Sequence, residues 1–393
     1  MTQQLLIVGG GIGGFATAVA ALRAGWQARL FEQAAAFTEV GAGIQLGPNA
    51  TRILGAWGLM DAPSLRASRP ERLVVHDGLD GRELGSLPLG AQAVARYGAP
   101  YLTVHRADLH ATLQAAAEAA GARTHAARRV EDVVEREASV SVRLDEALES
   151  EGDALVGADG LWSAVRAHVV GDAVPARSGH LAYRGLAPMA DVPPPLRGAT
   201  VRAWLAPRMH LVAYPVRGGE WLNVVCVVEG EAGGDPREWD HEAAVADLEH
   251  ALGPVCAAAR DCIRAVPAWR LWMLHDRPPV SGPDALVRGR IALLGDAAHP
   301  MRPYLAQGAG MAIEDAAELG RLLAVVDGKV LDVPTLLRRY ALNRWRRVAE
   351  VQQRSRRNGV LFHADGVLRV ARNAALRLAA PRLMDQPWLY AAS

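Results

Sequence analysis

Short apolar runs alternate with alanine-rich stretches at the start of the chain. Residues 4–8 (QLLIV) form a run typical of a strand buried on both faces of a parallel sheet. The stretch FATAVAALRAG that follows has helical composition and ends at Gly25. WQARLFE then has the length and the apolar positions of a second strand. This pattern predicts a compact βαβ unit.

The middle of the chain changes to a period of two, which is typical of strands. Short β-like runs fill 123–156, and within 178–230 the runs HLVAYPV and WLNVVCVV flank a Gly-Gly hairpin signal. IALLGD (291–296) is again typical of a buried strand. Helices are predicted over 48–59 and 105–121, twice around 239–263, from about 307, and as a long arginine-rich helix from about 334.

This order predicts an α/β fold in which a Rossmann-like domain is interleaved with a β-sheet domain and ends in long helices. A chain of 393 residues is too long for one ordinary domain core. We expect a nucleotide-binding domain of residues 1–75, 100–177 and 275–393. Residues 76–99 and 178–274 are expected to form a substrate-binding sheet domain.

Composition excludes several classes of function. The net charge is +1, which gives no support for a nucleic-acid or acidic-membrane partner, and the basic run Arg338–Arg357 is interpreted as the solvated face of a helix. No apolar run reaches the roughly 18 residues of a membrane span. Cys226, Cys256 and Cys262 form no CxxC and no even disulfide framework, so we expect a cytoplasmic location and predict no metal site. The oligomeric state stays open, with a homodimer as one option.

Gly9, Gly11 and Gly14 form a GxGxxG motif directly after a strand and at the start of a helix. The first glycine permits a tight turn, the second lets the backbone approach a pyrophosphate, and the third lets the helix pack on the strand. The helix N-terminus offers N–H groups to the phosphates. Glu32 ends the second strand, 18 residues beyond Gly14, where a carboxylate accepts hydrogen bonds from ribose hydroxyls. The sequence therefore predicts a dinucleotide site.

Two further motifs, GADG (157–160) and GDAAHP (295–300), each follow an apolar strand. An acid at the end of a buried strand is well placed to accept a hydrogen bond from a cofactor hydroxyl. Asp296 is the stronger case because QGAG opens a helix just beyond it. An NAD dehydrogenase would keep its cofactor site in one contiguous Rossmann domain. Motifs this far apart favour another dinucleotide.

In this order and spacing, the motifs resemble those of the FAD-dependent aromatic hydroxylases, the single-component flavoprotein monooxygenases typified by 4-hydroxybenzoate hydroxylase. The resemblance covers nearly the whole chain: GGGIGG with Glu32, GAGIQLGPN, HRADLH, GADGLWSAVR, GDAAHP and AQGAGMAIEDA. It implies an enzyme that binds FAD and is reduced by NADH or NADPH without a second Rossmann domain. It also implies that O₂ is a co-substrate and that a small aromatic ring is hydroxylated through a flavin C4a-hydroperoxide.

The resemblance also implies roles for single residues in cofactor binding. The three motif glycines and Glu32 would bind the ADP half of FAD, and Arg106 would reach its phosphate and ribityl region. Asp159 and Arg166 would serve both FAD and the transient nicotinamide nucleotide. Asp296 would hold the ribityl chain.

Other residues would surround the flavin ring. Gly308 and Ala309 would offer backbone N–H groups to its pyrimidine edge, where a helix N-terminus favours the negative charge of the reduced ring. Tyr304 would sit between flavin and substrate, and Gln45 would lie near the ring, although a plain loop residue explains Gln45 equally well.

The catalytic candidates lie in the run HLVAYPV. Residues four apart on a strand share a face about 13 Å long, so His210 and Tyr214 would line one surface. On residues alone such a pair is usually a core or surface pair, but hydroxybenzoate and hydroxynicotinate hydroxylases carry it at this spacing. His210 would contact the substrate hydroxyl and assist its deprotonation, with an ordinary pKa near 6.5. Asp77 fits either the substrate pocket or a plain turn, and His299 would tie down its loop.

Within the family, the chain looks most like the 3-hydroxybenzoate 6-hydroxylases, which form gentisate. Pro303 stands where those enzymes carry glutamine. The 6-hydroxynicotinate 3-monooxygenases share the proline but carry histidine at the positions of Tyr304 and Gln45, and salicylate 1-hydroxylase is a third member. We therefore expect a monocyclic hydroxylated aromatic acid as substrate. A flavin reductase or oxidase on the same fold and a non-enzymatic flavin-binding protein are the rival classes.

Overall fold

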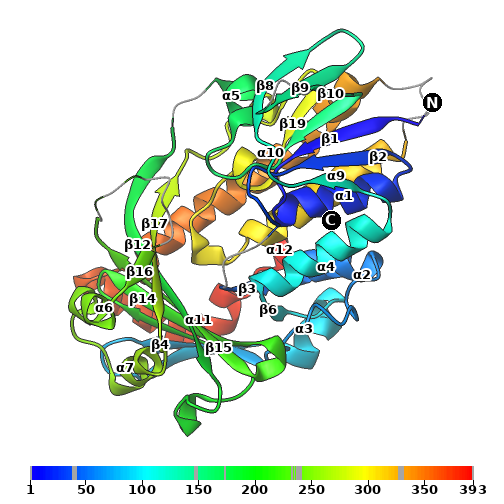
Figure 1. Cartoon of the computed structure of the whole chain (residues 1–393). Helices are drawn as coiled ribbons and strands as arrows, with labels where there is room; N and C mark the ends of the chain where they lie inside the picture. The colour runs from blue at the N-terminus through cyan, green and yellow to red at the C-terminus, as the bar shows by residue number, and fades with distance from the viewer. Residues whose placement is uncertain are drawn as a thin grey trace. The chain divides into compact units, whose positions relative to one another are not determined.

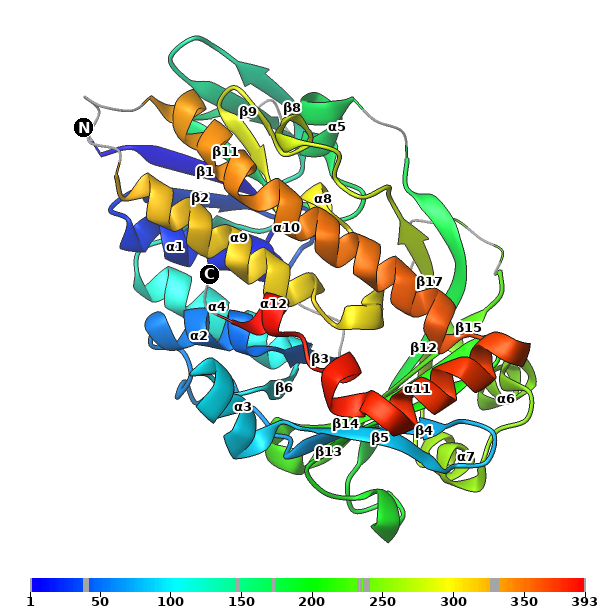
Figure 2. The same cartoon turned by 180° about the vertical axis from the view of Figure 1, so that it is seen from behind.

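The chain divides into two compact units, each built from three separate segments. Unit 1 comprises residues 1–40, 109–176 and 276–355, and unit 2 comprises 41–108, 177–275 and 356–393. Both appear in Figure 1, a computed structural model, and from behind in Figure 2. The structure describes residues 2–37, 42–145, 149–171, 174–231, 233, 235, 241–325 and 332–391. The predicted functional domains, which assign 42–75 and the C-terminal helices to the FAD-binding part, stay a prediction.

Unit 1 contains a mainly parallel sheet. Its strands are β1 Gln4–Val8, β2 Gln27–Phe31, β7 Arg123–His125, β11 Ala154–Gly157, β18 Val287–Arg288 and β19 Ile291–Leu293. They lie in the order β18–β19–β11–β1–β2–β7, parallel throughout except for β18 at one edge. A separate antiparallel sheet consists of β8 Val130–Glu135, β9 Val140–Leu144 and β10 Glu149–Gly152. The predicted βαβ unit is confirmed, with β1 at the centre of the parallel sheet.

The helices of unit 1 surround this sheet. They are α1 Ile12–Arg23, α4 Arg106–Ala119, α5 Ala164–Val170, α8 Gly295–Ala298, α9 Gly308–Leu323, α10 Val333–Phe362 and the 3₁₀ turns η4 Pro283–Ala285 and η5 Pro303–Leu305. The first residues of α4 and the last of α10 belong to unit 2. Helix α9 packs along α1, and Figure 2 shows α9 and α10 side by side.

Arginines of α10 face α9 rather than water. The buried Arg344 donates to Glu314 and Asp315 at 2.8 and 2.7 Å, and Arg347 also binds Glu314. The interpretation of the basic run as a solvated face is therefore wrong for Arg344. A helix of 30 residues that lies against another helix must bury one of its faces, and the charges on that face then need partners.

Unit 2 contains an eight-stranded sheet. Its strands are β4 Arg72–Asp77, β5 Glu83–Pro88, β12 Ala176–Pro188, β13 Thr200–Ala206, β14 Met209–Val216, β15 Trp221–Glu229, β16 His241–Ala243 and β17 Trp269–Asp276, in the order β16–β17–β12–β15–β14–β13–β4–β5. A two-stranded ladder joins β3 Gly43–Leu46 to β6 Leu102–His105. The predicted hairpin is confirmed: β14 and β15 pair around the turn η3 Arg217–Gly219.

Unit 2 also contains helices, some of which cover the two faces of this sheet. They are α2 Pro48–Ala56, α3 Gly90–Tyr97, α6 Val245–Leu252, α7 Ala257–Arg264, α11 Gly366–Met384, α12 Pro387–Tyr390 and the turn η2 Pro194–Leu196. One face packs Leu211 and Val224 against residues of α6 and α7. The other face packs Val75 and Leu205 against Leu376 and Met384 of α11, which Figure 2 shows beside β4 and β5.

Asp77 joins β4 to helix α11. Its buried carboxylate accepts hydrogen bonds from Arg369 at 2.7 Å and Asn373 at 2.6 Å, and from the backbone N–H of Leu79 at 2.8 Å. Burial opposes ionisation, but these hydrogen bonds and the charge of Arg369 lower the pKa of Asp77. The presence of an aspartate at position 77 is therefore explained by its hydrogen bond within the turn and by its contacts with α11.

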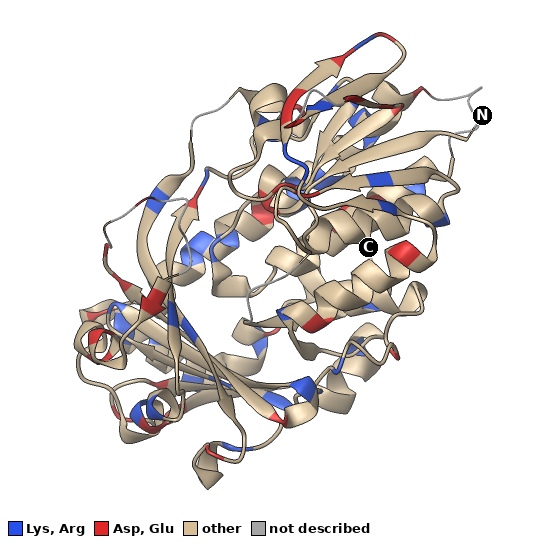
Figure 3. Ribbon diagram, in the orientation of Figure 1, with Lys and Arg blue, Asp and Glu red and all other residues tan. Residues whose placement is uncertain are grey.

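Charges of both signs are scattered along the ribbons, as Figure 3 shows. In the described part of the chain, no helix has the length and hydropathy needed to cross a membrane.

Candidate active site

The glycine-rich loop of unit 1 has no room for side chains at two positions. Gly9 has φ +105°, and a Cβ there would lie 2.3 Å from the carbonyl oxygen of Ala158. A Cβ on Gly14 would lie 1.9 Å from the carbonyl oxygen of Gly9. Gly11 caps α1 without a side-chain hydrogen bond to the helix. The first turn of α1 therefore presents backbone N–H groups, as a phosphate-binding loop requires.

Two side chains hold this loop in place. The Glu32 carboxylate accepts hydrogen bonds from the backbone N–H groups of Gly10 at 2.7 Å and Ala34 at 2.8 Å. The buried His110 donates from Nε2 to the carbonyl oxygen of Gly10 at 2.6 Å. His110 is the last residue of the HRADLH motif, and the sequence reasoning did not single it out because its partner lies a hundred residues away.

The GADG segment is held by local hydrogen bonds. Asp159 accepts from the Ser163 hydroxyl at 2.5 Å and from the N–H groups of Ala164 and Val165 at the start of α5. Burial nevertheless raises the pKa of Asp159. Arg166 donates to two carbonyl oxygens of the GDAAHP loop, at 2.7 and 3.1 Å. These hydrogen bonds give Asp159 and Arg166 a structural role in the GADGLWSAVR segment. Their roles in binding the cofactor stay predictions.

Asp296 is exposed although residues 291–295 and 297–300 around it are all buried. The loop that carries Asp296 is held by the buried Asp315. Its carboxylate accepts hydrogen bonds from His299 Nε2 at 2.5 Å and from the backbone N–H of Gly295 at 3.2 Å. The expectation that His299 ties down its loop is confirmed. The loop is thus held in place and leaves the Asp296 carboxylate exposed. A carboxylate that binds a cofactor hydroxyl must be accessible in this way.

The AQGAG segment leaves open space at the start of α9. A Cβ on Gly308 would meet no heavy atom within 4 Å, and the N-cap residue Gln307 makes no side-chain capping hydrogen bond. Ala309 is half-buried, and Tyr304 is buried in the turn η5. This open helix N-terminus can accept the edge of a planar ring that carries negative charge.

Unit 2 carries the predicted catalytic residues on one face of its sheet. In the strand registers, Arg184 pairs with Val225 and Val225 with Val212, the residue midway between His210 and Tyr214. Directly paired residues point to the same face, and so do residues two apart on a strand. Arg184, His210 and Tyr214 therefore share the face that α11 also covers in part.

A polar cluster surrounds Tyr214 on this face. The Tyr101 hydroxyl donates to Gln45 Oε1 at 2.7 Å, and Tyr214 also hydrogen-bonds Gln45. Burial raises the pKa of Tyr214, while the positive charge of Arg184 acts to lower it. Gln45 is thus more than a loop residue: it lies on β3 between the buried Tyr214 and the partly buried Tyr101. Gly41, which opens the GAGIQLGPN motif, lies outside the described residues.

Arg184 is a cation without an acidic partner among the described residues. Its guanidinium lies 3.9 Å over the ring of Trp272, and its Nε makes no hydrogen bond. Burial lowers the pKa of Arg184 to about 10. The nearby Tyr214 acts to raise this pKa, and the positive charge of Arg106 acts to lower it further. The side chain keeps part of its surface accessible. The sequence reasoning missed Arg184 because nothing in LAYRGLAP marks it apart from ordinary strand arginines.

His210 is buried and contacts a second histidine. Its Nδ1 lies 2.8 Å from Nε2 of His363, at the end of α10. Burial and then the charges of His363 and His180 lower the pKa of His210 well below its usual value. The expectation of an ordinary pKa is therefore wrong, because the ring lies in the protein interior. His210 is neutral at pH 7.

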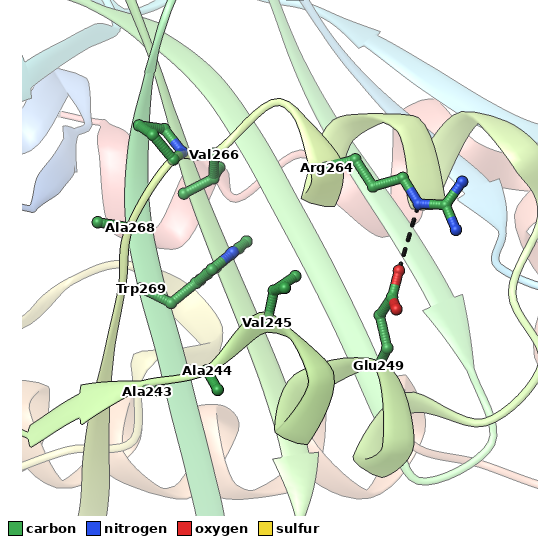
Figure 4. Close-up of a pocket in the computed structure, with 9 residues that line it drawn as sticks. Ala243, Ala244, Val245, Glu249, Arg264, Val266, Ala268 and Trp269 are labelled. Carbon is green, nitrogen blue, oxygen red and sulfur yellow. Dashed lines mark hydrogen bonds and ion pairs between the residues drawn. The ribbon is translucent and has the colours of Figure 1, made fainter.

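A cavity of about 470 Å³ lies elsewhere in unit 2. Figure 4 shows its lining, with Trp269 and the ion pair of Arg264 and Glu249. No residue predicted for catalysis or cofactor binding lines it. Unit 1 holds Gly9, Gly11, Gly14, Glu32, Asp159, Asp296, Tyr304, Gly308 and Ala309, and unit 2 holds Gln45, Arg106, His210 and Tyr214.

Comparisons with known proteins show the family of this chain. Residues 2–355 match the family described as FAD binding domain. The chain is 38% identical to the 3-hydroxybenzoate 6-hydroxylase of Polaromonas naphthalenivorans and to the 3-amino-4-hydroxybenzoate 2-monooxygenase PtmB3 of Streptomyces platensis, each over 98% of this chain and 95% of the relative. It is 35% identical to the 6-hydroxynicotinate 3-monooxygenase of Bordetella bronchiseptica, over 90% of this chain and 91% of the relative.

Solved structures show the same fold. A salicylate hydroxylase substrate complex has a TM-score of 0.83 at 24% identity, covering 99% of this chain and 95% of the other. HpxO of Klebsiella pneumoniae, complexed with FAD and uric acid, has a TM-score of 0.81 at 27% identity, covering 96% and 93%. The predicted fold class is confirmed.

The chain belongs to this FAD-binding family and is an FAD-dependent aromatic hydroxylase, a flavoprotein monooxygenase that uses NADH or NADPH and O₂. The residues present fit the cofactor, because the glycine-rich loop offers N–H groups for its phosphates and the start of α9 has open space.

Proposed function

We propose that the chain hydroxylates a monocyclic hydroxylated aromatic acid, with 3-hydroxybenzoate, converted to gentisate, as the first candidate. The observation that carries this proposal is Arg184, a cation without an acidic partner in the described chain, on the same sheet face as His210 and Tyr214. Burying an unpaired charge is costly, so an anionic ligand stabilises it. The compounds named for the three relatives above each carry a carboxyl and a hydroxyl group on one ring.

Each residue of this face has a role in the proposal. Arg184 would bind the substrate carboxylate, since a guanidinium forms charge-assisted hydrogen bonds with it. His210 would contact the ring hydroxyl, and Tyr214 with Gln45 would fix the plane of the ring. In unit 1, Glu32, Asp296 and the start of α9 would hold FAD. When bound, FAD supplies the redox chemistry with NAD(P)H and O₂.

A substrate panel tests the proposal. Purified holoprotein is mixed with NADH or NADPH and 3-hydroxybenzoate, salicylate, 6-hydroxynicotinate or 3-amino-4-hydroxybenzoate, and cofactor oxidation, peroxide release and product mass are measured. We expect strong stimulation by one of these acids and a product with one new ring hydroxyl group, added either at a free position or in place of the carboxyl group. Benzoate lacks the hydroxyl and 3-hydroxybenzyl alcohol lacks the carboxylate, so both should stimulate weakly. Equal NAD(P)H oxidation with and without aromatic acids, with peroxide as the only product, would instead support a flavin oxidase or reductase.

The panel also separates two alternatives. Through the resemblance described above, Pro303 favours 6-hydroxynicotinate, whereas Gln45 and Tyr304 favour 3-hydroxybenzoate. Salicylate remains the third candidate, and its product would be identified by loss of the carboxyl group. The product mass decides among the three.

We also propose a cytoplasmic location. Cys226, Cys256 and Cys262 are free and buried, which suits a reducing compartment. Fractionation of expressing cells tests this: FAD absorbance and hydroxylase activity in the secreted or membrane fraction would contradict it.

A further inference from the structure

A line of three side chains leads from the predicted catalytic histidine to the surface of unit 2. His210 Nδ1 lies 2.8 Å from His363 Nε2, and His363 Nδ1 lies 3.5 Å from Glu229 Oε1. The two histidines are buried, whereas the Glu229 side chain is 35% exposed. The three residues come from β14, the C-terminal end of α10 and β15.

The order of these atoms favours one arrangement of the protons. The contact of His363 Nδ1 with Glu229 is an ion-pair contact of 3.5 Å, longer than a hydrogen bond, and the negative charge of the carboxylate favours the form of His363 with its proton on Nδ1. Nε2 of His363 is then an acceptor, and it selects the form of His210 with its proton on Nδ1. Nε2 of His210 is thereby left with a lone pair. A carboxylate that holds an imidazole in one tautomer is a known way to prepare a base.

We propose that His363 and Glu229 are positioning residues that hold His210 as a proton acceptor and carry the proton of the substrate hydroxyl to the surface. This rests on the proposed function. The O–H bond of the substrate breaks as Nε2 of His210 takes its proton. The Nδ1 proton of His210 passes to Nε2 of His363, the Nδ1 proton of His363 passes to Glu229, and Glu229 releases it to water. The electron pair stays on the substrate oxygen as a phenolate, so no oxidant is needed.

The surroundings favour transfer over storage of the proton. Burial disfavours a charged imidazolium at His210, so a proton taken up there must move on. Other charged or titratable groups face the line: His180 on β12, Arg208 beside Glu229, and Arg372 of α11, which donates to carbonyl oxygens at the end of α10. Arg208 holds the other carboxylate oxygen of Glu229 at 3.1 Å, which leaves Oε1 directed toward His363.

The same cluster has a rival interpretation. Ligand atoms of His180, Glu229 and His363 all lie within 4.8 Å of one another, as in a divalent metal site. The relay is favoured because the Arg208 guanidinium already occupies Glu229 and adds positive charge next to any bound cation. Zinc binding is therefore one outcome of the test.

The test compares variants in the holoenzyme with the best acid of the panel. His363→Leu removes the acceptor for His210, His363→Gln restores an oxygen acceptor, and His180→Gln is the matched control beside the line. At pH 7 we expect His363→Leu to lower kcat for hydroxylation about 10- to 100-fold. The kcat of His363→Gln should fall less, and the kcat of His180→Gln should stay within about twofold of the wild-type value. The deficit of His363→Leu should shrink as pH approaches the ring hydroxyl's own pKa of about 10, where solvent ionises it.

A second measurement does not depend on turnover. In protein labelled with ¹⁵N-histidine, with the His210 signal assigned from His210→Ala, we expect the Nδ1–H tautomer of His210 in wild type and its loss in His363→Leu. The Nε2–H tautomer in wild type would overturn the proposal. So would a deficit of His363→Leu that is the same at every pH, since that is a structural defect. Stoichiometric Zn²⁺ binding that is lost in both His180→Gln and His363→Leu would assign the cluster to a metal. A wild-type enzyme that hydroxylates none of the acids, yet shows the expected tautomer, would refute the proposed function and leave the positioning geometry standing.

Discussion

Asp315 of α9 holds the loop that presents Asp296, so its charge should matter for both stability and FAD retention. Its buried carboxylate accepts from His299, from the N–H of Gly295 and from Arg344 at 2.7 Å. Asp315→Asn keeps the size of the side chain but removes the charge. The amide then leaves part of the buried Arg344 charge uncompensated, with Glu314 as its remaining acidic partner.

The size of the effect follows from the pKa. Burial acts to raise the pKa of Asp315, but the charges of His299 and Arg344 outweigh it and lower the pKa from 3.8 to about 2. At about 1.4 kcal/mol per pKa unit, this corresponds to about 2–3 kcal/mol of stability. Breaking a buried ion pair costs about 3–5 kcal/mol, so we expect a loss of about 3 kcal/mol in the free energy of unfolding.

The pH dependence has a definite sign. A carboxylate whose pKa is lowered by folding contributes its full stability above its unfolded pKa of about 3.9, and that stability is lost as pH falls through the folded value. The difference between wild type and Asp315→Asn should be constant above about pH 5 and should vanish near pH 2.

Urea unfolding at pH 7 and the heat-induced release of FAD fluorescence measure the two effects. Glu318→Gln is the matched control, because Glu318 lies on the same helix but pairs with the exposed Arg321, a contact worth about 0.2–1 kcal/mol. Asp315→Asn should unfold at clearly lower urea and release FAD at lower temperature than Glu318→Gln. The reasoning is refuted if the two variants unfold together and retain FAD equally.

Three further substitutions test the site. Gly14→Ala should abolish FAD retention, measured as the ratio of absorbance at flavin and protein wavelengths, because its Cβ would lie 1.9 Å from the carbonyl oxygen of Gly9. Asp296→Ala should weaken FAD retention on dilution while the circular dichroism spectrum stays unchanged, since the side chain is exposed and its loop is held by Asp315. Arg184→Leu should raise KM for the aromatic acid by tens of fold or more, from the loss of about 2–5 kcal/mol of charge pairing, with a smaller effect on 3-hydroxybenzyl alcohol.

Each substitution has a matched control. Gly282→Ala adds a Cβ that meets no atom within 4 Å, so it should keep FAD fully. Arg202→Leu removes an arginine from the same sheet whose guanidinium binds the carbonyl oxygen of Leu196, and it should leave KM unchanged. Full FAD content in Gly14→Ala or Asp296→Ala would contradict the roles proposed for these residues in the FAD site. An equal rise of KM for the acid and the alcohol in Arg184→Leu would contradict the role of Arg184 in binding the carboxylate.

The elements were predictable because their signals are local. The apolar run of β1, the glycine that opens α9 and the hairpin of β14 and β15 each depend on a few adjacent residues. The motif glycines were equally readable, since the GxGxxG spacing is itself local and Gly14 contacts Gly9 within one turn, although the close contact of Gly9 is with Ala158, far away in the chain. Local reasoning also found His299, whose partner Asp315 is only 16 residues away.

The remainder depends on contacts that no local pattern encodes. Arg344 is buried because α10 lies against α9, and a basic run on its own suggests the opposite. His110, Arg184 and His363 acquire their surroundings from segments far away in the chain, so their residue types gave no signal. The lowered pKa of His210 has the same origin, since the burial that causes it is a property of the assembled sheet and of the end of α10.

The order of strands in unit 1 has a consequence for biosynthesis. Strand β1 pairs with β11, and β11 pairs with β19, which begins at Ile291. At roughly 5–20 residues per second, a ribosome needs on the order of 15–60 s between the synthesis of β1 and that of β19. In the second half of that interval, after Ala154–Gly157 has been made, the edge of β11 that pairs with β19 has no partner strand, and throughout the interval the glycine-rich loop lacks α9. The nascent chain should therefore depend on chaperones until about four-fifths of it has been made, when α9 is complete, and FAD can act as a folding ligand only after that point.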